Sequence, residues 1–253
     1  MRNIKLTIEY DGAAYHGWQV QPEAGTIQGV MEEVIGRIVK EPVCLIAAGR
    51  TDAGVHALGQ VANFHTDSSI PPDALKRGLN SLLPDDIVIR ASEEVPFEFN
   101  ARKKARGKRY RYVILNQRDP SARHRFYSWH VREPIDVDSM RRGAGHLSGR
   151  HDFSSFRASG CGSRSPVKDL WRLDVEPATD GAFLHIVAEA DGFLRYMVRN
   201  IVGTLVDVGR GRRLDRDLKE ILECRNRGAA GATAPPQGLF LMEVFFGEKE
   251  IDR

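Results

Sequence analysis

Residues 43–66 read VCLIAAGRTDAGVHALGQVANFHT, in which two apolar runs flank a segment rich in glycine. The runs VCLIAA and QVANFHT predict two buried strands, because each is short, mostly apolar and bounded by turn-forming residues. Residues 49–59 then form the loop between these strands. This loop holds one carboxylate, Asp52, between Arg50, Thr51 and two glycines.

The sequence around this loop predicts further strands and helices. Alternation of apolar and polar residues predicts a strand over 4–10, and apolar residues at helical spacing predict a helix over 27–38 with Thr26 as its N-cap. A short helix is expected over 72–83 and a strand over 86–95. In the second half, we expect strands over 108–115, 167–178, 183–192 and 238–246, and helices over 136–147, 194–209 and 216–224.

These elements predict an α+β fold of two similar α/β halves, with mostly antiparallel sheets that helices cover on one face. We expect residues 1–104 to form the N-terminal half and residues 105–253 the C-terminal half. The segments LTIEYDGAAYHGW and HIVAEADGFLRYM share the order of strand, acid-glycine turn and aromatic residue, which two copies of one strand-and-helix unit would explain. Chance similarity is the alternative, because Asp-Gly turns after strands are common.

The composition indicates a folded chain that does not cross a membrane. It has 253 residues and is 42% hydrophobic, enough for one large domain or two of ordinary size. No apolar run approaches the roughly 18 residues of a membrane span. Three widely spaced cysteines favour a reducing compartment, the cytoplasm. Neither C-x-x-C nor H-E-x-x-H occurs, so we expect no metal.

Positive charge is concentrated in one segment. Residues 101–125 contain ten Lys or Arg and one acid, so their net charge is +9, and the rest of the chain sums to 3 − 9 = −6. Such a distribution suits a polyanionic partner. A solvated basic face is the alternative.

The Asp52 loop does not match common phosphate-binding or nucleophile motifs. A Walker loop needs Lys and then Ser or Thr after its second glycine, whereas Val55 and His56 follow here. No G-x-S-x-G elbow is present. The nearby cation Arg50 favours the anionic form of Asp52. An anionic, positioned aspartate can act as nucleophile or base, and a structural Asx-turn is the alternative.

The loop GRTDAGVHALGQVANF resembles the signature of the tRNA pseudouridine synthase A family. Seven other motifs resemble that family and occur in its order: YHGWQVQP, LNSLLPDDI, FNARKKARGKRYRYVI, GRHDFSSFRA, SRSP, GFLRYMVRNIVG and GLFLMEV. The resemblance covers residues 5–244. The segment 120–132 and the tail after 247 match the family weakly, so the resemblance implies little about how these two parts bind the substrate.

The resemblance implies the pseudouridine synthase fold, with the active site in the cleft between the halves. It implies a homodimer that isomerises uridine to pseudouridine in the anticodon stem-loop of tRNA, at positions 38–40, without metal or organic cofactor. Two alternatives are a non-catalytic RNA-binding module and the same isomerase acting on another RNA. An aspartyl-phosphate enzyme would need further acids for magnesium, and residues 42–65 contain only Asp52.

The resemblance also assigns roles to individual residues. The family's catalytic aspartate matches Asp52, its active-site tyrosine matches Tyr110, and the basic residue that pairs with the aspartate matches Arg199. Arg50 matches the loop arginine that helps to hold the flipped nucleotide. A tyrosine ring suits this reaction, because a target base must be flipped from its stack and can then stack on an aromatic ring.

The residues alone leave several of these roles open. Tyr110 and Tyr112 lie on one face of the same predicted strand, and either could be a core residue. For Arg199, the residues alone favour an exposed helix arginine. In the basic segment, the candidate contacts for RNA are Arg106, Lys108 and Arg109. We expect core or structural roles for Trp18, Phe193, His56 and His65.

Overall fold

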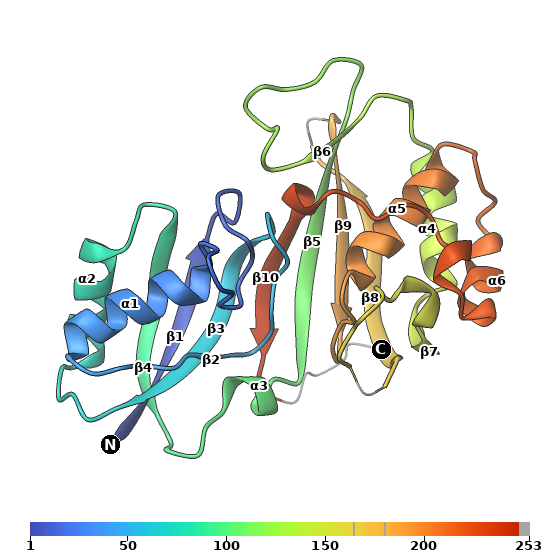
Figure 1. Ribbon diagram of the computed structural model, residues 1–253. Coiled ribbons are helices and arrows are strands. Elements are labelled where there is room, and N and C mark those ends of the chain that lie inside the picture. Colours follow the sequence, from blue (N-terminus) through green and yellow to red (C-terminus); the bar gives the residue numbers. More distant parts are fainter. Residues whose placement is uncertain (164, 180, 248–253) are drawn as a thin grey trace. The chain divides into compact units, whose positions relative to one another are not determined.

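The computed structural model describes residues 1–163, 165–179 and 181–247 (Figure 1). Residues 164, 180 and 248–253 lie outside this description, and with them part of the SRSP motif and the end of the predicted C-terminal half. The chain divides into two compact units. Unit 1 comprises Met1–Arg106 and Phe240–Arg253, and unit 2 comprises Gly107–Leu239.

Unit 1 is built on a strand, β1 (Arg2–Tyr10), that pairs antiparallel on both edges with β3 (His56–Thr66) and β4 (Ile87–Val95). The short β2 (Ile46–Ala47) also pairs antiparallel with β3. The last strand of the chain, β10 (Leu239–Phe245), pairs parallel with β3. The sequence placed this strand in the C-terminal half; in the structure, its residues from Phe240 onward belong to unit 1.

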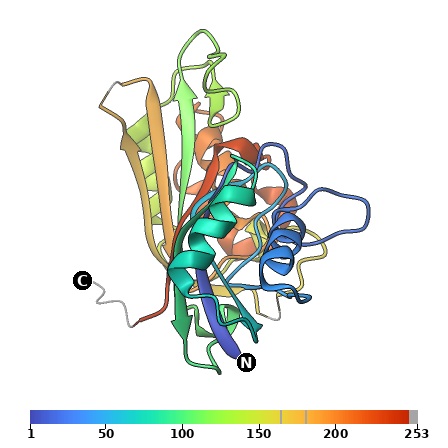
Figure 2. The same ribbon diagram turned by 90° about the vertical axis from the view of Figure 1, so that its left-hand side faces the viewer.

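Two helices, α1 (Ile27–Val39) and α2 (Pro72–Leu82), cover one face of the unit 1 sheet (Figure 2). Alternate residues of β1 point to this face, and Ile4, Leu6 and Ile8 are almost fully buried there. Burying one such side chain stabilises the fold by about 1.5–3 kcal/mol. Thr26 caps α1 as predicted, because its side-chain oxygen accepts from the backbone N–H of Gly29 at 3.3 Å.

Unit 2 contains the antiparallel strands β5 (Gly107–Asn116), β9 (Phe183–Ala190), β8 (Val167–Pro177) and β7 (Gly149–Asp152), in that order across the sheet. The short β6 (Trp129–Val131) pairs parallel with β5. Its helices are α4 (Val137–Gly145), α5 (Met197–Gly209) and α6 (Asp217–Cys224). The α+β class and the mostly antiparallel pairing predicted from the sequence are confirmed.

The strands of the two similar segments, LTIEYDGAAYHGW and HIVAEADGFLRYM, have similar pairing in the two units. β1 and β9 each pair antiparallel with a neighbour on both edges, and each is followed in the chain by a helix, α1 or α5. Two copies of one strand-and-helix unit predict this arrangement.

Several predicted boundaries differ from the structure. β3 begins at His56, so the loop that carries Asp52 is shorter than the predicted 49–59, and β2 has only two residues. β6, β7 and the helix α3 (Ala101–Lys104) were not predicted. Among the described residues, no helix is both long enough and apolar enough to span a membrane.

Candidate functional site

The main chain on both sides of Asp52 is fixed by contacts within unit 1. The Thr51 carbonyl accepts from the backbone N–H of Trp18 at 3.1 Å, and the Thr51 hydroxyl lies 2.7 Å from that of Tyr10. The Gly49 carbonyl accepts from the Gln60 side chain at 2.9 Å. Thr51, Trp18, Tyr10 and Gln60 are all buried. The loop is therefore anchored to the core immediately before the aspartate.

Asp52 itself opens a tight turn. The backbone N–H of Val55 donates to the Asp52 carbonyl at 3.1 Å, and Gly54 has a φ of 75°. A positive φ at the third position is the feature of a type II turn, and it explains the glycine in the sequence. The Asp52 side chain is half-buried, and Arg50 is exposed. The loop thus holds the backbone of a carboxylate that stays partly accessible.

Gly17 allows a second segment to approach this turn. It has a φ of 90°, and a Cβ added there would lie 2.8 Å from the Thr51 carbonyl oxygen and 3.0 Å from the Ala53 nitrogen. Glycine at this position therefore lets residues 15–18 pack on the loop. The backbone N–H of Gly54 donates to the Tyr15 carbonyl at 3.3 Å, which fixes the far side of the turn.

The histidines near the loop have contacts that suit the structural roles expected from the sequence. His56 is buried, and its Nδ1 lies 3.0 Å from an Asp11 carboxylate oxygen and 3.1 Å from the Gly12 nitrogen. Its ring stacks on Phe240 at 4.7 Å. His65 Nε2 lies 3.0 Å from the Phe97 carbonyl oxygen.

In unit 2, the two tyrosines of β5 have different surroundings. Tyr112 is fully buried, its hydroxyl donates to the Pro235 carbonyl at 2.7 Å, and burial raises its pKa. Tyr110 is 7% exposed, and its ring meets Phe193 edge to face at 5.1 Å. Tyr112 is therefore a core residue. Tyr110 is the tyrosine on this strand face that keeps some exposure.

Two aromatic residues expected in the core differ from each other. Trp18 is buried, as predicted. Phe193 is only half-buried and lies between β9 and α5, where its ring contacts that of Tyr110. The expectation of a core position was wrong for Phe193, because the residue precedes the helix and packs at its edge.

Arg109 is held by an ion pair across the sheet. Its Nε lies 2.7 Å from Glu189 Oε1, and the two residues are direct partners in the β5–β9 ladder. Glu189 is buried, so a cation beside it compensates a charge that would be costly to bury alone. This structural role was not predicted, since the sequence suggested only an RNA contact for Arg109.

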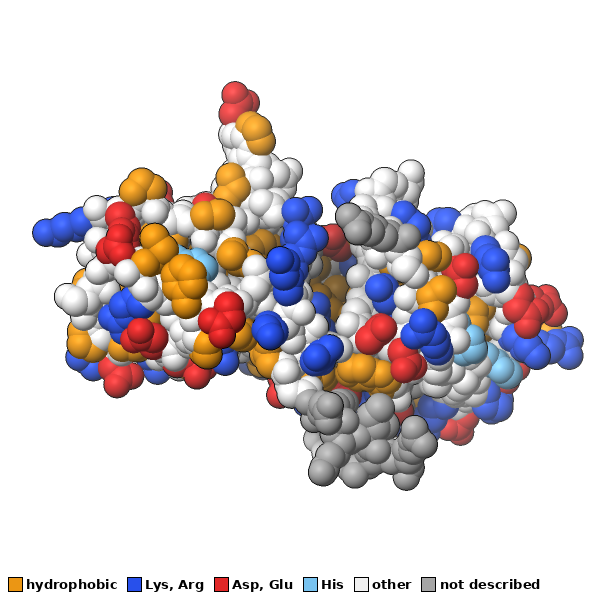
Figure 3. Space-filling view, turned by 90° about the horizontal axis from the view of Figure 1, so that it is seen from below, with side chains coloured by type: hydrophobic (Ala, Val, Ile, Leu, Met, Phe, Trp, Pro, Cys, Tyr) orange, Lys and Arg blue, Asp and Glu red, His pale blue; other side chains and the backbone are white. Residues whose placement is uncertain are grey.

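Other parts of the basic segment are exposed. In unit 1 these are Arg102, Lys103 and Lys104 of α3, and Arg106. Figure 3, viewed from the end of the molecule at which α3 lies in Figure 1, shows a group of Lys and Arg side chains. Lys108 is half-buried.

The loop between β5 and β6 in unit 2 adds exposed arginines and aromatic residues. Arg118, Arg123 and Arg125 are exposed, and Phe126 and Tyr127 are 47% and 41% exposed. The Arg125 guanidinium lies 4.3 Å from the centre of the Phe126 ring. These two aromatic residues were not among the predicted RNA contacts, although they directly follow a basic run, which is typical of such a contact.

Arg199 lies near the start of α5 and is fixed at both its backbone and its side chain. Its Nε donates to the Ala234 carbonyl at 2.7 Å, and its own carbonyl accepts from the Ala234 nitrogen at 3.1 Å. Its guanidinium lies 4.7 Å from the centre of the Tyr196 ring. Arg199 is half-buried, and these side-chain contacts distinguish it from an ordinary exposed helix arginine.

The contact between α5 and residues 230–235, which we call the strap, requires a glycine. A Cβ added to Gly203 would lie 1.7 Å from the Ala232 carbonyl oxygen. We expect Gly203→Ala to lower the free energy of unfolding by about 3 kcal/mol or more, because overpacking a rigid backbone contact is destabilising. Urea unfolding measures this. The control is Gly145→Ala in α4, where an added Cβ meets nothing within 4 Å; equal stability of the two variants would contradict a close strap.

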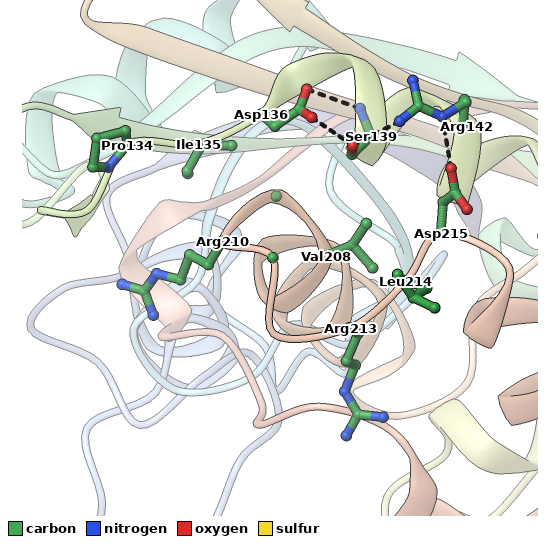
Figure 4. Close-up of a pocket in the computed structure, with 12 residues that line it drawn as sticks. Pro134, Ile135, Asp136, Ser139, Arg142, Val208, Arg210, Arg213, Leu214 and Asp215 are labelled. Carbon is green, nitrogen blue, oxygen red and sulfur yellow. Dashed lines mark hydrogen bonds and ion pairs between the residues drawn. The ribbon is translucent and has the colours of Figure 1, made fainter.

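A cavity of about 620 Å³ lies in unit 2 where α4 begins and α5 ends (Figure 4). On its rim Arg142 donates to Asp215 at 2.6 Å and to Ser139 at 2.7 Å, and the bond from Arg142 lowers the pKa of Asp215. The residues that line it include none of the site residues predicted from the sequence.

The predicted site residues divide between the units. Unit 1 holds Arg50 and Asp52 in one anchored loop, and Arg106 is the last residue of its first segment. Unit 2 holds Tyr110 on β5 and Arg199 on α5, and the contacts of Phe193 and of the strap bring these two elements together. Among the described residues, no group of three or more His, Cys, Asp or Glu side chains could hold a metal ion.

Comparison with known proteins gives a consistent result over nearly the whole chain. The family model for tRNA pseudouridine synthase matches residues 6–102 and 144–247. The match includes Asp52 and Arg199, while Tyr110 and the basic strand fall between its two segments.

Three relatives, each named tRNA pseudouridine synthase A, align with 97% of this chain. The protein of Acetivibrio thermocellus is 50% identical over 246 residues, and that of Geobacter sulfurreducens is 49% identical over 247; both are covered completely. The protein of Myxococcus xanthus is 48% identical over 246 residues, with 92% of its length covered. These matches confirm the resemblance found in the sequence, and the chain belongs to the tRNA pseudouridine synthase family.

Proposed function

We propose that this protein isomerises uridine to pseudouridine in the anticodon stem-loop of tRNA, at positions 38–40, with Asp52 as the nucleophile. The observation that carries the proposal is the anchored turn at Asp52. It holds the backbone of a half-buried carboxylate in place, within a segment that the family model matches. The names of the relatives support tRNA as the substrate class.

The chemistry fits the types of residue proposed for the site. The bond between uracil N1 and the ribose C1′ breaks, the base rotates, and a bond from C5 to C1′ replaces it. The proton at C5 is lost and N1 regains one, so there is no net oxidation or hydrolysis. We propose that Asp52 attacks the substrate, that Tyr110 stacks on the flipped uracil, and that Arg50 helps to hold the nucleotide. Arg199 supplies a fixed cation.

Tritium release from uridine labelled at C5 in tRNA transcripts tests this function directly. The purified protein should release tritium in buffer alone, and transcripts with uridine replaced at positions 38–40 should release none. A protein that binds tRNA and releases no tritium would be a non-catalytic RNA-binding module. Release from other RNAs at the same rate would show that tRNA is not the specific substrate.

We propose that the exposed Arg106 of unit 1 and the half-buried Lys108 of unit 2 bind RNA phosphates. The arginines and aromatic residues of the β5–β6 loop follow the other end of β5 from Lys108 and are a separate candidate contact, since a base can stack on an exposed Phe or Tyr ring. For Arg109, the ion pair with Glu189 makes a stability role the better proposal.

Arg106→Ala is expected to weaken tRNA binding uniformly. A lost phosphate contact should reduce the slope of log affinity against log salt by about one unit. KM should rise while kcat at saturating tRNA stays near wild type, because a contact made equally before and during the reaction does not favour the transition state. Filter binding at several salt concentrations measures the slope. Arg90→Ala, another exposed arginine of unit 1, is the control; an unchanged slope for Arg106→Ala would place the RNA elsewhere.

We also propose a cytoplasmic homodimer. The described structure has three free cysteines, which suits a reducing compartment. The dimer is supported by the resemblance of the sequence to the family, and sedimentation equilibrium of the purified protein measures it.

A further inference from the structure

The side chain of Arg227, at the start of the short 3₁₀ helix Arg227–Ala229, joins α5 to the strap. Its Nη2 lies 3.0 Å from Asn200 Oδ1 and 3.0 Å from Thr233 Oγ1. Its Nη1 donates to the carbonyls of Gly231 at 2.9 Å and Ala230 at 3.4 Å. One guanidinium therefore contacts the helix and three residues of the strap.

Asn200 completes this network and lies next to Arg199 in the chain. Its Oδ1 accepts from the Thr233 hydroxyl at 2.6 Å as well as from Arg227, and its Nδ2 donates to the Phe156 carbonyl at 2.8 Å. The Asn200 side chain is fully buried. Its orientation is fixed by these contacts, which in turn fix where the strap lies on α5.

The acceptors named for Arg227 are all neutral. Placing a half-buried cation against carbonyl, amide and hydroxyl oxygens is costly, and this burial lowers the pKa of Arg227. A planar fork presents donors from two separate nitrogens in fixed directions, as the contacts of Nη1 and Nη2 require, whereas a lysine presents its three donors from a single nitrogen. The geometry therefore indicates a need for the shape of arginine and not only for its charge.

The strap holds the Arg199 side chain. Ala234 is bonded to Arg199 both through its carbonyl, at 2.7 Å from Nε, and through its nitrogen. With Nε occupied, the remaining N–H donors of Arg199 are those on its two Nη atoms, and their direction depends on where Ala234 lies. Thr233, which Arg227 binds, is the residue before Ala234.

We propose that Arg227 is a positioning residue for the isomerisation, which sets the direction of the Arg199 guanidinium by fixing the strap on α5. This inference rests on the proposed function and on a role for Arg199 in it. A misplacement of about 1 Å at a reacting site can lower a rate by about 100-fold, so a shift of the strap is sufficient to affect kcat.

A double-mutant cycle separates this role from simple stabilisation. Arg227→Met and Arg227→Lys are compared with wild type, and each is repeated in an Arg199→Ala background, by tritium release in single turnovers at saturating tRNA. We expect each single variant to lower kcat by about tenfold or more with KM within about threefold. In the Arg199→Ala background the further loss should be less than about twofold, because the two residues act as a unit.

Arg225→Met is the matched control, since Arg225 lies two residues away, is 68% exposed and pairs with Asp152 at 3.4 Å. Its kcat should equal that of wild type. Circular dichroism and urea unfolding establish that each variant is folded under assay conditions. If Arg227→Met does not fold, Thr233→Val removes the strap side of the network alone, and its expected loss of about threefold or more should likewise vanish without Arg199.

Three failures can be told apart. No tritium release by the wild type would overturn the proposed function. An active wild type with an equally active Arg199→Ala variant would remove the role of Arg199, and this inference with it. A slow Arg199→Ala variant together with a folded Arg227→Met variant at the wild-type rate would overturn the inference alone. Equal losses in both backgrounds would do the same, because they would show a stabilising role only.

Discussion

Asp52→Asn is expected to lower kcat for pseudouridine formation by about 1,000-fold or more, as removal of a nucleophile does in other enzymes that use covalent catalysis. The substitution keeps the shape of the side chain and removes its charge. An amide is a far weaker nucleophile than a carboxylate, so the loss belongs to the chemical step.

The structure predicts that this variant keeps its fold and its affinity for tRNA. The turn is closed by backbone groups of Asp52 and Val55, and it is anchored through Thr51, Gly49 and Gly54. The side chain of residue 52 supplies none of these bonds. Urea unfolding should therefore give a free energy within about 1 kcal/mol of wild type, and tRNA affinity should stay within a few-fold.

Asp86→Asn is the matched control. Asp86 is also a half-buried carboxylate of unit 1, and it accepts from the Tyr15 hydroxyl at 2.6 Å, a bond that an amide oxygen can keep. Its variant should react at close to the wild-type rate. Tritium release by Asp52→Asn at more than a tenth of the wild-type rate would contradict the assignment of Asp52 as the nucleophile.

Most of the fold was predictable because its strands and helices have strong periodic patterns. The buried residues of β1 alternate, and α1 carries a capping threonine and apolar residues at helical spacing. β7 was missed because its sequence, GRHD, is polar, and its pairing with β8 depends on backbone bonds that leave no hydrophobic pattern. The membership of β10 in unit 1 was also not predictable, since a parallel partner far away in the chain leaves no local signal.

The candidate site was only partly predictable for a related reason. The Asp52 loop has a local signature of glycines, and the structure explains Gly54 by its positive φ. The role of Arg109 depends on Glu189, eighty positions later, and that of Arg227 depends on Asn200 and Thr233. The sequence does not distinguish a basic residue that faces solvent from one that compensates a buried group. Tertiary contacts alone distinguish these cases.

The tyrosines of β5 give the second large effect. Tyr110→Phe is expected to lower kcat by about 100-fold, if the hydroxyl moves the proton at C5, because a positioned acid or base contributes about 100- to 10,000-fold. Tyr110→Leu should lose more and also raise KM, since stacking on the flipped base is worth about 1–3 kcal/mol. Steady-state tritium release measures both constants. Tyr110 is 7% exposed, whereas Tyr112 is fully buried, and the Tyr110 ring contacts Phe193 at the start of the segment that leads into α5; these observations support the expectation.

Tyr112→Phe should behave in the opposite way. The Tyr112 hydroxyl donates to the Pro235 carbonyl at 2.7 Å. Removing the hydroxyl leaves this part-buried carbonyl without its donor, so the free energy of unfolding should fall by about 1–3 kcal/mol. The strap keeps its bonds to Arg199 and to Arg227, so kcat at a temperature where the variant is folded should stay within about fivefold of wild type. The two phenylalanine variants on one strand face would then separate a role in the chemical step from a role in packing.

Three outcomes would contradict these predictions. A Tyr110→Phe variant with a normal kcat would limit Tyr110 to stacking, and a Tyr110→Leu variant with normal kcat and KM would remove Tyr110 from the site. A collapse of kcat in a folded Tyr112→Phe variant would instead mean that the strap end at Pro235 controls Arg199 more strongly than Arg227 does.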